Sequence, residues 1–159
     1  IFSQWVNTIE QLRARLKEFG TVEYHGRIPS SRRDEVITTF RDDPDKHVIL
    51  MSYGAGSVGL NLQFAGYVFL FDRWWNPAVE DQAINRAHRI GATGPVTVTR
   101  FLASGTIEER INRVLEEKRE LFNAVFDGTP KAKLGLSRKE IFGLFNLRFP
   151  SVNDLEEAA

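Results

Sequence analysis

Apolar positions along this chain recur with two different periods. Five short runs rich in β-branched and aromatic residues are typical of buried strands, and they cover residues 1–3, 22–25, 47–53, 67–72 and 96–103. Between them, apolar residues recur every three or four positions and predict helices over residues 7–19, 30–41 and 77–90. Because strand and helix alternate regularly, the pattern predicts an α/β domain whose parallel sheet is flanked by helices and joined by right-handed crossovers.

Three features mark the ends of the predicted helices. Gly20 follows the first helical segment, and glycine readily adopts the left-handed conformation that ends many helices. Ser30 and Ser31 open the second segment and predict side-chain caps for its first turn. Pro77 opens the third segment, where its missing N–H costs nothing.

A longer amphipathic helix is predicted over residues 106–126, and a second short helix over residues 137–146. The apolar stripe of the long helix is expected to dock on an apolar surface. The acidic tail from Ser151 is expected to fray. These patterns predict a main domain over residues 1–105, a helical C-terminal extension over residues 106–150 and a tail over residues 151–159.

Length, charge and cysteine content exclude several classes of protein. The chain has 159 residues and is the size of one main domain, and its first residue, Ile1, indicates a piece of a longer protein. Its 21 basic residues balance 21 acidic ones, so only local patches are expected to contact nucleic acid. The sequence has no cysteine, which excludes disulfides and thiolate zinc sites and favours an intracellular protein. No apolar run reaches membrane-spanning length, so no membrane association is expected.

The residues that follow each strand are the first candidates for a site, because ligands of open parallel sheets bind beyond the carboxyl ends of the strands. Gln4 follows the first strand, Gly26 and Arg27 follow the second, and a glycine-rich loop over residues 54–59 follows the third. The fourth strand is followed by the sequence RWWNP, residues 73–77.

Gln82, Arg86 and Arg89 fall within roughly 60° of one another on a helical wheel, away from the apolar face of their predicted helix. The planar guanidinium suits phosphate oxygens, and two such groups one turn apart would stabilise charge on a transferring phosphoryl group. An arginine finger is therefore one hypothesis. The alternative is a solvated face on which the arginines pair with Glu80 and Asp81.

The loop SYGAGSVGLNL, residues 52–62, has three glycines that let the backbone approach an anion closely. No Gly-Lys-Ser/Thr follows, so the loop is not a Walker A motif, and a purely structural turn stays an alternative. Ser52 and Asn61 are the side chains best placed to bond a phosphate or to hold the loop.

The stretch YHGRIPSSRR, residues 24–33, combines Arg27, Arg32 and Arg33 with a helix start, which favours contact with a nucleic-acid backbone. Neighbouring acidic residues leave a capped, solvated helix end as the alternative. Trp74 and Trp75 are expected to pack rather than to stack on a base. The three histidines lack metal-ligand spacing and the sequence offers no nucleophile–base pair, so neither metal nor covalent chemistry is expected.

Five motifs, in chain order, resemble the second-lobe motifs of the Swi/Snf family of DNA-translocating ATPases in helicase superfamily two. They are IFSQW, YHGRIPSSRR, SYGAGSVGLNL, DRWWNPAVEDQA and NRAHRIG. The later GTIEERI and LSRKEIFGLF are similar to the C-terminal extension of the family. The resemblance implies a C-terminal RecA-like lobe that closes on a separate N-terminal lobe, which carries the Walker A lysine and the Mg²⁺ site.

The resemblance also implies roles for individual residues. Arg86 and Arg89 match the two arginines that face the nucleotide, with Arg89 as the finger on the γ-phosphate and Gln82 positioning the motif or the attacking water. Gly56, Gly59 and Asn61 match the loop that couples nucleotide state to DNA. Ser52, Gln4, Gly26 and Arg33 match DNA-side positions, to which the basic patch adds Arg27. Three positions depart from the family pattern, namely Asn85, Ala92 and Ser57.

The sequence therefore predicts the second motor lobe of an ATP-dependent double-stranded DNA translocase or remodeller. Its cofactor is ATP with Mg²⁺, bound mainly by the N-terminal lobe of the same chain, and its candidate substrate is a protein on DNA. The fragment alone is expected to be inactive. Two alternatives stay open, a strand-separating DNA or RNA helicase and a non-enzymatic module that docks on nucleic acid or protein.

Overall fold

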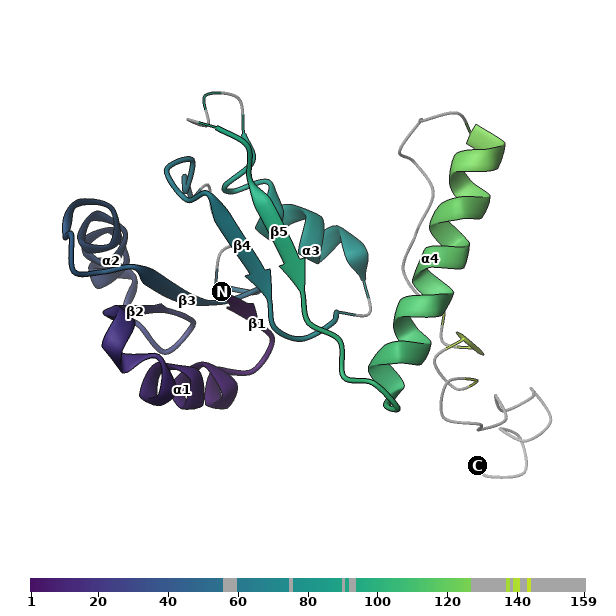
Figure 1. Cartoon of the computed structure of the whole chain (residues 1–159), viewed down its shortest axis with the longest axis horizontal. Coiled ribbons are helices and arrows are strands. Elements are labelled where there is room, and N and C mark those ends of the chain that lie inside the picture. Colours follow the sequence, from purple (N-terminus) through teal and green to yellow (C-terminus); the bar gives the residue numbers. More distant parts are fainter. Residues whose placement is uncertain are drawn as a thin grey trace, which may run out of the picture. The chain divides into compact units, whose positions relative to one another are not determined.

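The computed structural model describes residues 1–55, 60–74, 76–89, 91, 94–126, 137, 139, 140 and 143. The sheet in this part of the chain has five strands, all parallel, in the order β2-β3-β1-β4-β5 (Figure 1). The strands are β1 (Phe2–Ser3), β2 (Thr21–Tyr24), β3 (Val48–Ser52), β4 (Tyr67–Leu70) and β5 (Thr97–Arg100). The predicted α/β fold with a parallel sheet is confirmed, and each strand begins and ends within three residues of its predicted range.

Helices connect most of these strands. They are α1 (Val6–Arg15), the 3₁₀ turn η1 (Lys17–Phe19), α2 (Ser30–Asp42), α3 (Pro77–Ile84) and, after the last strand, α4 (Ile107–Phe126). The chain divides into two compact units, one over residues 1–74 and 78–102 and the other over residues 75–77 and 103–159. The whole sheet, with α1, α2 and nearly all of α3, belongs to the first unit.

The core of the first unit lies on both faces of the central strands. Leu50, Met51 and Leu70 are fully buried. Apolar side chains of α2 and α3 pack on the face that holds Met51 and Leu70, whereas α1 buries Ile9 and contacts β1, β2 and β3. This packing follows from the period-two pattern of the strands, because alternate residues point to opposite faces of the sheet.

Gly20 ends the first helical segment, as its position in the sequence predicts. Its φ is +60°, and a Cβ at this position would lie 1.7 Å from the carbonyl oxygen of Asp45. Any other residue would therefore need both a strained backbone and a shift of the neighbouring chain. Glycine is required here for the turn into β2.

Two predictions about helix ends are wrong. The second helix starts after Pro29 with no side-chain cap, so Ser30 and Ser31 do not cap it. The third helix ends at Ile84 rather than at residue 90, and residues 85–89 continue in turns. One reason is tertiary: the carbonyl of Arg86 accepts a hydrogen bond from the backbone N–H of Leu62 at 3.0 Å, across to the loop after β3.

In the second unit, α4 begins one residue later than predicted. Thr106 Oγ1 accepts from the N–H of Glu108 at 3.2 Å and donates to the carbonyl of Ala103 at 2.7 Å, which fixes the start of the helix. Ile111 and Leu115 are buried and pack with other apolar residues of the stripe. The predicted helix over residues 137–146 falls largely outside the described residues, and the tail from residue 151 lies entirely outside them. No helix in the described part of the chain has the length and apolar character needed to cross a membrane.

Candidate functional site

The candidate residues that follow β1, β2 and β3 lie at one edge of the sheet. Because the strands are parallel and β1 pairs with β3 in the register Ser3 to Ser52, their carboxyl ends meet there. The structure thus brings together Gln4, the Gly26–Arg27 turn and Ser52. This edge also holds the start of α2, from which Arg33 projects.

Ser52 and Asn61 each make a local hydrogen bond. Ser52 is buried, and its Oγ accepts from the N–H of Ala55 at 3.3 Å. Asn61 is exposed, and its Oδ1 accepts from the N–H of Gln63 at 3.1 Å. Both bonds hold the ends of the glycine-rich loop. Gly56 and Gly59 lie outside the described residues, and so does Ser57, one of the three positions that depart from the family pattern.

The basic residues of the second motif already have partners within the protein. Arg27 is exposed, and its Nη1 lies 2.7 Å from Oε1 of Glu10 on α1. Arg33 donates from Nε to the carbonyl of Ile28 at 3.0 Å, and its guanidinium lies 5.8 Å from the centre of the Tyr24 ring. Gly26 is exposed, and a Cβ there would meet no atom within 4 Å. The structure gives Gly26 no steric reason to be glycine.

Gln82, Arg86 and Arg89 differ from these residues because no acidic group pairs with either arginine among the described residues. Gln82 is exposed on α3, and Arg89 is exposed in the turns after it. Arg86 is half-buried, and its Nε is buried without a hydrogen-bond partner in the described part of the chain. Burial lowers the pKa of Arg86, and Tyr24 acts on it electrostatically in the opposite direction.

Glu80 does not pair with these arginines, contrary to one alternative from the sequence. The carboxylate is buried at the start of α3, and its Oε2 lies 3.1 Å from Nη1 of Arg73 and 3.4 Å from Nε of Arg100. Its Oε1 accepts from the N–H of Trp74 at 3.1 Å. Glu80 therefore ties the β4–α3 loop and the end of β5 to the helix that carries Gln82.

A second carboxylate, Asp72, joins the ends of three neighbouring strands. Its Oδ2 accepts from Oγ of Ser3 at 2.5 Å and its Oδ1 from the N–H of Gln4 at 2.8 Å. The hydroxyl of Tyr53 donates to the Asp72 carbonyl at 3.0 Å. Burial raises the pKa of Tyr53 far above its usual range, and the charges of Glu80 and Asp72 add to that effect, so the hydroxyl keeps its proton.

Glu80 and Asp72 are missing from the predicted site residues. A signal for each exists in the sequence, because Asp72 directly ends an apolar run and Glu80 falls in the first turn of a helix that begins at a proline. Neither signal shows which groups the carboxylate meets, since their partners lie up to 69 residues away along the chain.

Trp74 and His25 pack within the protein, whereas Trp5, His47 and His88 are exposed. Trp74 is partly buried, with its ring centre 6.1 Å from that of Tyr53, as packing predicts, while Trp75 lies outside the described residues. His25 is buried, and its Nδ1 accepts from the N–H of Arg27 at 3.3 Å. No group of three or more metal-ligating side chains gathers among the described residues.

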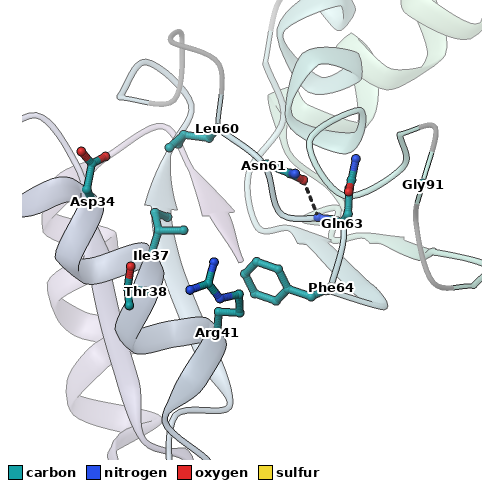
Figure 2. A pocket seen from close by; sticks show the side chains of 9 residues that line it. All are labelled: Asp34, Ile37, Thr38, Arg41, Leu60, Asn61, Gln63, Phe64 and Gly91. Carbon is teal, nitrogen blue, oxygen red and sulfur yellow. Dashed lines mark hydrogen bonds between the residues drawn. The ribbon is translucent and has the colours of Figure 1, made fainter.

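A cavity of about 520 Å³ opens between α2 and the loop after β3 (Figure 2). Its lining includes Arg41 and Thr38 from the helix and Asn61 and Phe64 from the loop. Of the predicted site residues, Asn61 alone lines it among those described. Neither Arg86 nor Arg89 lines this cavity.

The sequence of the chain is similar to known proteins. A family model described as the helicase conserved C-terminal domain matches residues 1–91. The helicase-like transcription factor CHR27 of Arabidopsis thaliana is 46% identical over 129 residues, which cover 79% of this chain and 12% of that protein. The DNA repair protein RAD5 of Cryptococcus neoformans is 39% identical over 149 residues, which cover 91% of this chain and 12% of that protein.

Two solved structures share the fold. The C-terminal part of the Fun30 ATPase domain superposes with a TM-score of 0.68 at 32% identity, covering 70% of this chain and 36% of that one. The Sulfolobus solfataricus SWI2/SNF2 ATPase core domain superposes with a TM-score of 0.63 at 34% identity, covering 94% of this chain and 31% of that one.

The chain belongs to the helicase conserved C-terminal domain family, in the branch of the SNF2 (Swi/Snf) ATPases. The resemblance seen in the sequence is therefore confirmed. The chain spans about an eighth of the length of the curated relatives described above.

Proposed function

We propose that this chain is the second motor lobe of an ATP-dependent translocase on double-stranded DNA. It completes the nucleotide pocket of an N-terminal lobe in the same protein and grips the DNA backbone while the cleft between the lobes opens and closes. A protein bound to the DNA is the candidate substrate of the remodelling. The isolated chain does not hydrolyse ATP, because the Walker A lysine and the Mg²⁺ ligands belong to the other lobe.

The observation that carries the proposal is the half-buried guanidinium of Arg86, whose Nε has no hydrogen-bond partner in the described part of the chain. A partly desolvated cation is costly unless an anion compensates it. Phosphate oxygens suit the planar fork of the guanidinium, and Arg89 follows three residues later with its side chain exposed. The two arginines therefore act as fingers that stabilise charge on a transferring phosphoryl group.

ATP with Mg²⁺, when bound, supplies the phosphoryl group and a metal charge on its oxygens. The residues of this chain bind and orient it. Arg89 contacts the γ-phosphate, Arg86 supports it, and Gln82 holds the motif or orients the attacking water. Gly56, Gly59 and Asn61 form the loop that senses the nucleotide.

The DNA side of the proposal rests on the shared sheet edge. Gln4, Ser52 and the Gly26–Arg27 turn gather there, and the N-terminus of α2 with Arg33 adds partial positive charge. Contacts of this kind hold phosphates and leave the bases unread, so binding is expected to be independent of sequence and to weaken as salt increases.

DNA-stimulated ATP turnover by the full-length protein tests the proposal. Arg89→Ala is expected to lower turnover by about 10³-fold or more, as loss of an arginine finger does elsewhere. Arg41→Ala is the control, since Arg41 pairs with the adjacent Asp42 on the surface of α2. Turnover equal to that of the parent in Arg89→Ala would overturn the finger assignment.

A second assay separates the proposed activity from its alternatives. A double-stranded DNA translocase displaces the third strand of a triplex and leaves the duplex intact. Unwinding of a DNA or RNA duplex would indicate a strand-separating helicase instead. A full-length protein that binds DNA but shows no ATP turnover would indicate a docking module.

A further inference from the structure

Two hydrogen-bonded networks, one half-buried and one buried, lie between the proposed DNA-side edge of the sheet and the helix that carries Gln82. The first centres on Asp72 at the end of β4, and the second on Glu80 at the start of α3. Arg73 and Trp74, which both bind Glu80, directly follow Asp72 in the chain. The two networks are therefore joined by consecutive residues of the backbone.

The Asp72 network holds the segment that carries Gln4. The carboxylate accepts from the N–H of Gln4 at 2.8 Å and from the hydroxyl of Ser3 at 2.5 Å. Ser3 is fully buried, and its Oγ accepts in turn from the N–H of Trp5 at 3.2 Å. Any shift of the Gln4 backbone is thus resisted by a carboxylate on the neighbouring strand.

The Glu80 network holds the start of α3 in a similar way. The side chain of Glu80 is 2% exposed and that of Arg73 is 7% exposed, and they lie 3.1 Å apart. The same carboxylate accepts from the N–H of Trp74 at 3.1 Å. In a poorly solvated interior such charge-assisted bonds are stronger than in water, so Arg73, Trp74 and Glu80 are expected to move together.

We propose that Asp72 and Glu80 are positioning residues that transmit the engagement of DNA at the Gln4 segment to the nucleotide-facing segment on and after α3. DNA that pulls on the Gln4 backbone shifts Asp72, and the β4–α3 loop carries the shift to Glu80 and α3. The inference rests on the proposed function and deepens it, because it names the residues through which DNA stimulates ATP turnover. In this proposal, the shift moves Asp72 and the start of α3 relative to the rest of the sheet, which stays in place.

The test uses the full-length protein and measures ATP turnover without DNA, turnover at saturating duplex DNA, and DNA affinity. Asp72→Asn keeps the shape of the side chain but cannot accept from both Ser3 and Gln4. Ser3→Ala is a milder change that leaves the carboxylate in place and removes the bridge to Trp5. Glu23→Gln is the control, because Glu23 pairs with Arg13 at 3.1 Å in contacts outside these networks.

Asp72→Asn is expected to lower DNA stimulation about tenfold at saturating DNA, and the milder Ser3→Ala about fivefold, both within the range of coupling between sites in other proteins. Turnover without DNA and the DNA affinity should stay within about twofold of the parent, because neither side chain is assigned to nucleotide or DNA. A merely structural role would lower all three measurements together. If Asp72→Asn fails to fold, the DNA stimulation measured in Ser3→Ala tests the inference by itself.

A double-mutant cycle between Asp72→Asn and Glu80→Gln tests whether the two networks form one link. One link predicts that the second substitution causes little further loss of stimulation, whereas independent effects would multiply. Multiplying effects, or stimulation equal to that of the parent in Asp72→Asn and Ser3→Ala, would overturn the inference. A parent protein that DNA does not stimulate would instead overturn the proposed function.

Discussion

Two pairs of arginines flank α3, and their surroundings are opposite. Arg73 and Arg100 meet the buried carboxylate of Glu80, at 3.1 and 3.4 Å. Arg86 and Arg89, which follow the helix, meet no carboxylate among the described residues, although Arg86 is half-buried. The two pairs therefore differ in whether a carboxylate of the protein compensates their charge, although Nε of Arg73, like that of Arg86, is buried without a hydrogen-bond partner in the described part of the chain.

We expect this difference to separate residues that stabilise the fold from residues that act on a ligand. A guanidinium with a buried internal acceptor is part of the architecture, and its removal leaves a charge uncompensated. A guanidinium held in place without an acceptor costs the fold some free energy and is available to an external anion. The same test distinguishes Arg27, which pairs with Glu10, from the arginines after α3.

Among the variants that test this contrast, Arg86→Ala is expected to have the largest effect, a loss of turnover with the fold intact. ATP turnover by the full-length protein is expected to fall by about 10³-fold, because positive charge facing the transferring phosphoryl group is lost. The midpoint of chemical denaturation of the 159-residue chain is expected to stay unchanged or to rise, since a poorly solvated cation is removed. A large drop in that midpoint would show that Arg86 stabilises the fold, as Arg73 and Arg100 do.

The opposite pattern is expected of Glu80→Ala. Removing the carboxylate leaves Arg73 buried and uncompensated, which costs about 3–5 kcal/mol in the free energy of unfolding. Glu80→Gln keeps an acceptor for the N–H of Trp74 and should cost less. Urea denaturation of the chain measures both variants, and a change below about 1 kcal/mol in Glu80→Ala would break the contrast between the pairs.

A subtler effect is expected of Arg89→Lys, which keeps the charge but not the planar fork. Turnover is expected to fall roughly 10²-fold, because a lysine cannot make two parallel hydrogen bonds to a phosphate. Full activity in this variant would show that charge alone suffices at this position. Circular dichroism of the same preparation serves as the control for folding.

The smallest effect is expected of Arg27→Ala. Its ion pair with Glu10 is exposed at both ends, so its loss should change the free energy of unfolding by about 1 kcal/mol or less. If Arg27 also meets a DNA phosphate, the variant should release about one counterion fewer on binding. The slope of the logarithm of DNA affinity against the logarithm of salt concentration should then be shallower by about one. Titrations at several salt concentrations check this, and an unchanged slope would assign Arg27 to the fold alone.

The strands were predictable because each depends on a local pattern. Buried strands of a parallel sheet are apolar on both faces, so runs such as residues 47–53 stand out against the polar segments around them. Gly20 was predictable for the same reason, since a helix end is a local event. The length of α3 shows where prediction from local pattern stops. The helical pattern continues to residue 90, but the helix ends at Ile84. The carbonyl of Arg86 accepts a hydrogen bond from the N–H of Leu62, which belongs to a distant loop that the local pattern does not show.

By itself, the sequence determined the alternation of strands and helices, the position of each motif and the family to which the chain belongs. The tertiary structure decided which charges meet. One alternative from the sequence paired Glu80 with Arg86 and Arg89, whereas in the structure Glu80 pairs with Arg73 and Arg100. The physical reason is that strand and helix patterns depend on neighbours along the chain, whereas the partner of a charge depends on which segments the folded sheet brings within a few ångströms of it.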